Sequence, residues 1–161
     1  KLTARVRSSD VLRETLLEWG ISPTRANLQH LAIVMNKGFG LGTLSHAVKN
    51  RIESLNADIV IFDGMRWESD AQLLKSFNKN LLIYVTASPK TRYARIKKRK
   101  EKAGEDTVSF QQFLREEKIA TETHIPEIAK KADCAINNDT DLTYLRFEVK
   151  KLLVDIHKLG L

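Results

Sequence analysis

The chain has 161 residues, of which 42% are hydrophobic, and this suits a single globular domain with a real core. Its net charge of +7 and pI near 9.6 favour an anionic partner, such as a nucleotide, a nucleic acid or a membrane surface. The single cysteine, Cys134, excludes an internal disulfide, and we find no run of membrane-spanning length and no signal-peptide pattern. These features predict a cytoplasmic protein.

A strand and a helix are expected at the start of the chain. Leu2, Ala4 and Val6 alternate with polar residues, which predicts a half-buried strand. Ser8-Ser9-Asp10 offers an N-cap for a helix that ends at Gly20. Two readings of Asp10 stay open at this point: it caps the helix, or it is a carboxylate that faces an active cleft.

Two further helices follow, one starting at Ser22-Pro23 and one running from about Thr43 to Leu55. The glycine-rich segment 38–42 between them comes after a helix and lacks a Gly-Lys-Ser/Thr ending. It therefore predicts a joint between helices and not a phosphate-binding loop.

The most informative stretch is 57–66, where an apolar run ends abruptly in Asp63-Gly64-Met65-Arg66. The apolar run predicts a buried parallel strand. In open α/β sheets, ligands bind just outside the carboxyl ends of strands. Asp63 and Arg66 are therefore placed to hold a metal-bound phosphate and a second phosphate.

The rest of the chain continues the alternation of strands and helices that indicates a parallel sheet. A strand is expected at 81–86, and the helix that Ala87-Ser88-Pro89 caps carries Arg92, Arg95 and Arg99 on one side. A polar helix-turn-helix excursion is expected at 107–122. Residues 126–131 then lead into a short strand at 133–136, the loop 137–140 and a last helix.

Four landmarks in this order resemble P-loop kinases of the dephospho-coenzyme A kinase and nucleoside monophosphate kinase group. They are Ser9-Asp10-Val11-Leu12-Arg13, similar to the acceptor-site turn; Asp63-Gly64-Met65-Arg66, similar to the Asp-Gly-Phe-Pro-Arg turn of adenylate kinases but one residue shorter; Arg95-Ile96-Lys97-Lys98-Arg99, similar to the lid motif; and 132–139, similar to the last strand and the loop beside the base. Their order and spacing also resemble a set of uncharacterised predicted nucleotide kinases, more closely than adenylate kinase itself.

This resemblance implies an α/β fold, with a three-layer parallel sheet that has helices on both faces, and one kinase-like domain over 1–161 with a small helical lid at about 97–122. The family's first strand, Gly-x-x-x-x-Gly-Lys-Ser/Thr loop and first helix have no counterpart in residues 1–161. We expect them to precede Lys1, because a parallel sheet without its central strand leaves backbone groups unpaired. The other reading is that the protein has lost them.

The resemblance implies an ATP-dependent phosphotransferase that uses Mg²⁺ and acts on a small phosphorylated acceptor, such as dephospho-coenzyme A or a (deoxy)nucleoside monophosphate. Asp63 would orient Mg²⁺ or one of its waters. Arg66 would bind the acceptor phosphate bidentately, whereas Asp10 would contact the acceptor hydroxyl or phosphate and Arg13 would add positive charge. Asp63 also fits a simple turn, and Arg66 fits a solvated arginine.

On the nucleotide side, Arg95 and Arg99 would close over the triphosphate and stabilise charge in the transition state, with the help of Lys98. Asn137 and Asn138 would offer amide contacts to the base, although paired asparagines after a strand are also ordinary turn formers. A solvated basic face is the competing explanation for the cationic helix.

Two rival functions stay open. One is a nucleotide-binding regulatory relative that does not catalyse, and true absence of the P-loop would favour it. The other is a nucleic-acid-binding module, which the net charge and the basic run 97–102 suggest. Few aromatic residues in the lid region and the lack of a recognisable nucleic-acid-binding motif argue against this module. The sequence does not define the acceptor or the oligomeric state.

Overall fold

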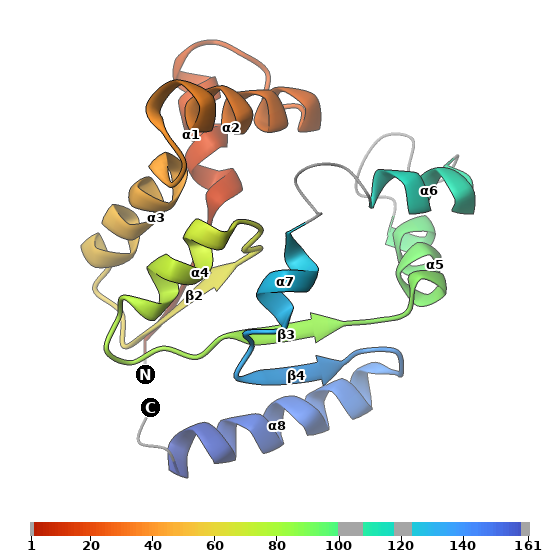
Figure 1. The fold of residues 1–161 in the computed structure, drawn as a ribbon. Coiled ribbons are helices and arrows are strands. Elements are labelled where there is room, and N and C mark those ends of the chain that lie inside the picture. Colours follow the sequence, from red (N-terminus) through yellow and green to blue (C-terminus); the bar gives the residue numbers. More distant parts are fainter. Residues whose placement is uncertain (1, 100–107, 118–123, 159–161) are drawn as a thin grey trace. The chain divides into compact units, whose positions relative to one another are not determined.

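The computed structural model describes residues 2–99, 108–117 and 124–158. They form two compact units, Lys1–Phe77 and Asn78–Leu161. In chain order (Figure 1) the elements are β1 (Thr3–Arg7), α1 (Ser8–Glu18), α2 (Arg25–Phe39), α3 (Thr43–Ser54), β2 (Ile59–Asp63), α4 (Glu68–Lys75), β3 (Ile83–Thr86), α5 (Pro89–Arg99), α6 (Phe110–Glu116), α7 (Ile125–Ala129), β4 (Cys134–Asn137) and α8 (Leu142–Lys158). The predicted lid falls partly outside the described residues, at 100–107 and 118–122. The single domain stays a prediction.

In the first unit, β1 and β2 pair in parallel, as the sequence predicts, with Thr3 opposite Ile59 and Arg7 opposite Asp63. The inner face of this pair packs on α3 and α4 through Val6, Val48 and Leu73, which are 2%, 0% and 7% exposed. Partly buried apolar side chains surround this cluster: Val11, Ile52, Val60, Phe62 and Phe77. This core fixes the carboxyl ends of both strands relative to the helices.

The first three helices share a second apolar cluster in the same unit. Its buried members come from α1, α2 and α3: Leu12, Leu16, Leu31, Ala32 and Leu44. The joint between α2 and α3 uses Gly40 and Gly42 at φ of 98° each, a backbone region that glycine adopts without strain. The predicted joint between helices is therefore confirmed.

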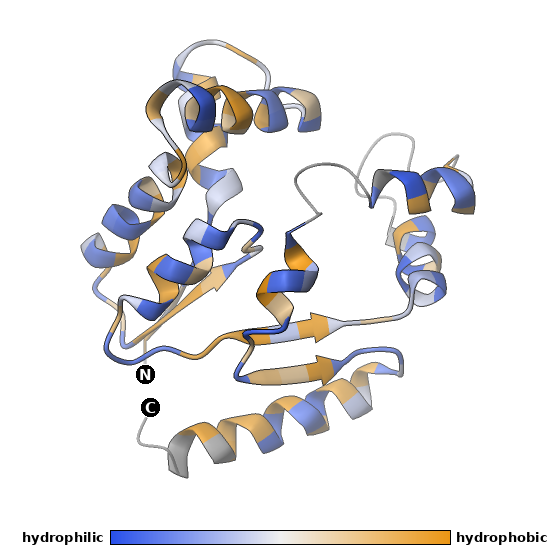
Figure 2. Cartoon of the chain, viewed as in Figure 1, coloured by the Kyte–Doolittle hydropathy of each residue, from blue (hydrophilic) through white to orange (hydrophobic). Residues whose placement is uncertain are grey.

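In the second unit, β3 and β4 also pair in parallel, with Ile83 opposite Cys134 and Thr86 opposite Asn137. Helix α8 runs along β4 (Figure 1). Buried apolar residues of this unit include Leu82, Ile128 and Ile136. The strands themselves are apolar (Figure 2), which is why the sequence predicts them so clearly.

Helix starts are where the structure departs from the sequence predictions. Helix α2 begins at Arg25 and not at Ser22-Pro23, because the Thr24 hydroxyl accepts a hydrogen bond from Asn27 N at 3.2 Å and acts as the N-cap. The segment that leads into β4 is itself a helix, α7, with Pro126 in its first turn. Short helices such as this one carry too little periodicity to be read from sequence.

Several β-branched residues lie exposed on the strands. Ile59 and Ile61 of β2 are 43% and 50% exposed, and Ile83 and Val85 of β3 are 38% and 55% exposed.

Among the described residues, no helix combines the length and the apolar character that crossing a membrane requires.

Candidate functional site

The first group of polar side chains lies at the carboxyl ends of β1 and β2. The parallel register places Arg7 directly opposite Asp63, so both strands end at the same edge of their sheet. Helix α1 starts immediately after Arg7, which brings Asp10 to this edge within its first turn. The edge therefore gathers charged groups of both signs where a parallel sheet usually binds its ligand.

Asp10 pairs with Arg7 and does not cap its helix. Its two carboxylate oxygens accept hydrogen bonds from Arg7 Nε at 3.1 Å and Arg7 Nη2 at 2.9 Å. The N-cap of α1 is Arg7, and no side chain caps that end, so the N-cap reading of Ser8-Ser9-Asp10 is wrong. The hydrogen bonds that Arg7 donates to Asp10, and the negative charge of Asp10, raise the pKa of Arg7 above its ordinary value, and the charge of Asp63 adds to this.

Asp63 is the last residue of β2 and its side chain is half-exposed. One of its carboxylate oxygens lies 3.9 Å from Arg5 Nη1. Mg²⁺ in phosphate sites takes one or two carboxylates and completes its shell with water and phosphate oxygens. A single accessible carboxylate therefore fits this role, and among the described residues no group of three or more His, Cys, Asp or Glu side chains offers a cage for a metal.

The turn after Asp63 depends on a glycine and a buried acid. Gly64 has a φ of 78°, which a residue with a Cβ adopts only with strain. Asp70, 1% exposed, accepts hydrogen bonds from Arg66 N at 2.9 Å and Trp67 N at 3.0 Å. The Ser45 hydroxyl on α3 donates to the same carboxylate at 2.8 Å. The core thus holds the backbone on which Arg66 is mounted.

Arg66 and Arg13 occupy exposed positions in this unit. Arg66 follows Gly64 and precedes α4, whereas Arg13 lies on α1 one helical turn after Asp10. The unit thus contains each residue that the sequence predicts for the acceptor. The contacts given above join Asp10 to Arg7 and the backbone of Arg66 to Asp70.

The second group of polar side chains lies at the carboxyl ends of β3 and β4, in the other unit. The chain leaves β4 at Asn137 and turns at once: Asn138 N donates to Thr86 O at 2.7 Å, and Asp139 N donates to Asn137 Oδ1 at 3.0 Å. The second bond is the local turn that asparagine side chains commonly make. The side-chain oxygen of Asn137 is therefore engaged within the loop 137–140.

Helix α5, which follows β3 in the chain, contacts this loop through Arg95. Arg95 donates from Nη1 to Asn138 O at 2.6 Å and from Nη2 to Thr140 O at 2.8 Å. Lys98 is exposed on the same helix. Arg99 ends α5, and its side chain lies outside what the structure describes. The structure thus brings Arg95 together with Asn138, as two of the predicted nucleotide-binding residues.

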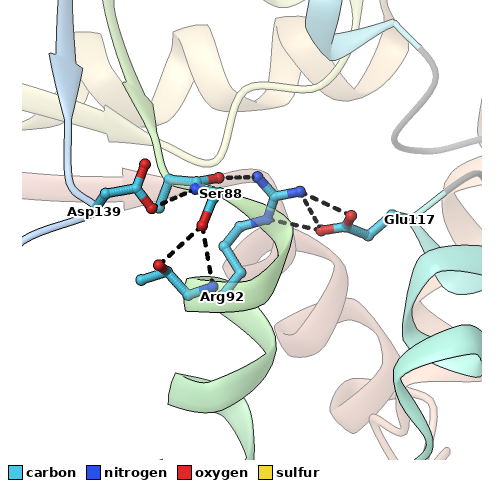
Figure 3. Close-up of polar contacts among 6 residues, drawn as sticks. Ser88, Arg92, Glu117 and Asp139 are labelled. Atoms are coloured by element: carbon cyan, nitrogen blue, oxygen red, sulfur yellow. Dashed lines mark hydrogen bonds and ion pairs between the residues drawn. The ribbon is translucent and has the colours of Figure 1, made fainter.

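Arg92 makes the polar junction at the start of α5 (Figure 3). Its guanidinium pairs with both oxygens of Glu117, from Nε and Nη2 at 2.8 Å each, and Nη1 also donates to Ala87 O. On the other side, Ser88 N donates to Asp139 Oδ1 at 2.7 Å. The backbone hydrogen bond from Ser88, followed by the hydroxyls of Thr91 and Ser88, holds the pKa of Asp139 below its ordinary value.

Three residues of these two groups escaped the sequence predictions: Arg7, Asp70 and Asp139. Arg7 carried a usable signal, since it stands three residues before Asp10 and at the end of a predicted strand. Asp70 had the weaker signal of an acid in the first turn of a helix. Asp139 had none, because its partner Ser88 is 51 residues away in sequence.

Comparison with known proteins finds similar sequences that share one name, and a solved structure with a similar fold. No family model matches the chain. It is similar to proteins named UPF0200 from Hyperthermus butylicus (27% identity over 144 residues, 89% of this chain and 76% of that protein) and Pyrobaculum aerophilum (27% over 149 residues, 91% and 80%). It is also similar to a crystal structure of shikimate kinase from Bacteroides thetaiotaomicron, with a TM-score of 0.60 at 12% identity, over 99% of this chain and 85% of that one.

The chain has an α/β fold similar to that of this shikimate kinase. At 12% identity the neighbour carries the fold alone, and the name UPF0200 specifies neither an activity nor a substrate. The predicted fold class is therefore confirmed, whereas the subgroup that the motifs resemble stays a prediction.

Proposed function

We propose that this protein is an ATP-dependent phosphotransferase that acts on a small phosphorylated acceptor, such as dephospho-coenzyme A or a (deoxy)nucleoside monophosphate. The observation that carries the proposal is the set of charged groups at the carboxyl ends of β1 and β2, in a chain whose fold is similar to that of a shikimate kinase. Phosphoryl transfer asks a protein for positioning and charge stabilisation, and fixed arginines and carboxylates supply both.

The first unit would bind the acceptor. Arg7 holds Asp10 as a fixed anionic hydrogen-bond acceptor, which suits contact with the acceptor hydroxyl or its phosphate-bound proton. Arg66 would bind the acceptor phosphate through its planar fork, and Arg13 would add positive charge. Asp63 would hold Mg²⁺ directly or through water, and the ion would neutralise charge on the phosphate oxygens.

The second unit would bind the nucleotide. Lys98 and Arg99, on the last turn of α5, would contact the phosphates and stabilise charge that develops during transfer. The loop 137–140, with Asn137 and Asn138, would border the base. Mutagenesis of these residues tests the roles proposed for them in nucleotide binding.

ATP binding by the full-length protein, measured by calorimetry with and without Mg²⁺, is the first test, and a screen of phosphorylated acceptors for ADP release is the second. Mg²⁺-dependent ATP binding with acceptor-dependent ADP release is the expected result. ATP binding without ADP release for any acceptor would favour a non-catalytic regulatory protein. Absence of ATP binding, together with oligonucleotide affinity that falls steeply with salt, would favour a nucleic-acid-binding module.

Two variants separate the proposed roles. We expect Arg66→Ala to raise KM for the acceptor, because it removes a phosphate ligand, and Arg99→Ala chiefly to lower kcat, because it removes charge stabilisation. Arg146→Ala, which removes an exposed arginine of α8, is the matched control and should leave both constants unchanged. Near-wild-type kinetics in both Arg66→Ala and Arg99→Ala would remove the assigned roles.

A further inference from the structure

The contacts of Arg95 are unusual for a phosphate ligand. It is an exposed cation on α5, yet two of its guanidinium nitrogens donate to neutral backbone carbonyls, those of Asn138 at 2.6 Å and Thr140 at 2.8 Å. The two carbonyls lie two residues apart, so the planar fork spans the loop from one side to the other. A lysine ammonium, as a single point charge on a flexible stem, does not reproduce this geometry.

The same loop is held at a second point between these two carbonyls. The Asp139 carboxylate accepts a hydrogen bond from Ser88 N at 2.7 Å, at the start of α5 (Figure 3). Asn138 N donates to Thr86 O at 2.7 Å, and Asp139 N donates to Asn137 Oδ1 at 3.0 Å. Backbone groups from Asn138 to Thr140 are thus directed toward the loop's own supports.

Lys98 provides the contrast on the same helix. It is exposed and has no hydrogen bond or ion pair to another described residue. Among the described residues nothing pairs with the Lys98 ammonium, whereas a phosphate group would have to displace two hydrogen bonds to reach the Arg95 guanidinium. Arg95 and Lys98 are therefore suited to different tasks.

We propose that Arg95 is a positioning residue for the loop 137–140, which it holds in the shape that receives the nucleotide base, and that it is not a phosphate ligand. The inference rests on the proposed nucleotide binding and replaces the phosphate-binding role that the resemblance to P-loop kinases implies for Arg95. Arg95 acts on the base through the loop, whereas Lys98 acts on the phosphates directly. The loss of Arg95 therefore weakens the binding of any ligand that carries the base, with or without phosphates.

The test compares adenosine with ATP, because the nucleoside has the base and lacks the phosphates. Calorimetry of the full-length protein should show that Arg95→Ala lowers the affinity for adenosine and for ATP by about the same factor, on the order of tenfold. This is the loss expected when charge-assisted hydrogen bonds that shape a site are removed. Lys98→Ala should lower the affinity for ATP and leave the affinity for adenosine unchanged. Arg95→Lys should recover little of the loss, and Arg146→Ala is the charge-matched control.

A second readout needs no ligand. Hydrogen exchange of the Asn138 and Asp139 amides should speed up in Arg95→Ala, because both amides lie in the loop that Arg95 spans. Unchanged exchange would overturn the positioning role, as would a loss of affinity confined to ATP. If the wild-type protein binds neither adenosine nor ATP, the proposed function fails, and so does the role of Arg95 toward the base. Faster hydrogen exchange in Arg95→Ala would then show that Arg95 does position the loop and that the proposed function was the part that was wrong.

Discussion

The turn after β2 and the loop after β4 both lie at the carboxyl end of a parallel strand, yet their supports differ in burial. Asp70, 1% exposed, holds the turn after β2, whereas the exposed side chains of Arg95 and Asp139 hold the loop after β4. A buried donor that loses its partner has no water to replace it, but an exposed donor does. The comparison teaches that the first turn is fixed by the core and that the second is fixed by solvent-exposed contacts.

The largest effect is expected for Asp70→Ala. The substitution removes the acceptor shared by Arg66 N, Trp67 N and Ser45 Oγ, so we expect a loss of ~2–4 kcal/mol in the free energy of unfolding. Urea denaturation measures it. Gln72→Ala, an exposed change on the same helix, should cost less than ~0.5 kcal/mol. Equal losses in the two variants would contradict the role of Asp70 as the buried support.

The next effect concerns the backbone of the same turn. Gly64 has a φ of 78°, and a Cβ there would meet nothing within 4 Å, so Gly64→Ala should cost ~1 kcal/mol through backbone strain alone. Gly38 lies inside α2 with equally open space, and Gly38→Ala should instead stabilise by ~0.5–1 kcal/mol. Shifts of the same sign in thermal melts of both variants would show that strain does not decide the difference.

A smaller effect on global stability is expected for Arg95→Ala. Its hydrogen bonds lie at an exposed position, so the free energy of unfolding should fall by less than ~1 kcal/mol. Urea denaturation beside Asp70→Ala makes the comparison direct. A loss as large as that of Asp70→Ala would mean that the loop after β4 belongs to the cooperative core, and the contrast between the two supports would be lost.

The smallest effect is a titration. The folded-state pKa of Asp139 lies below the ordinary value of 3.8, so the stabilisation from its carboxylate is present above pH 3.8 and is lost as pH falls through the lower folded pKa. The Ser88 amide proton shift in NMR spectra should therefore titrate with a midpoint below 3.8. Asp139→Asn should abolish that titration. A midpoint above 3.8 in the wild-type protein would show that Ser88 does not stabilise the charged form.

The sequence by itself determined the order of the strands and the longer helices, and the positions where strands end in polar residues. Hydrophobic periodicity is a local signal, and the apolar run before Asp63 and the basic side of the helix that carries Arg95 are written in neighbouring residues. The pairing of Arg7 with Asp10 was also within reach, since the two residues are three positions apart. The motifs that resemble P-loop kinases are local in the same sense.

Only the tertiary structure decided which polar groups support which turn. The Ser45 hydroxyl reaches Asp70 across 25 positions, and Arg95 reaches the loop after β4 across 43 and 45 positions. No local pattern encodes such contacts, because they depend on the packing of α3 against α4 and on the parallel pairing of β3 with β4. The burial that makes Asp70 costly to replace likewise exists only once the core has formed around it.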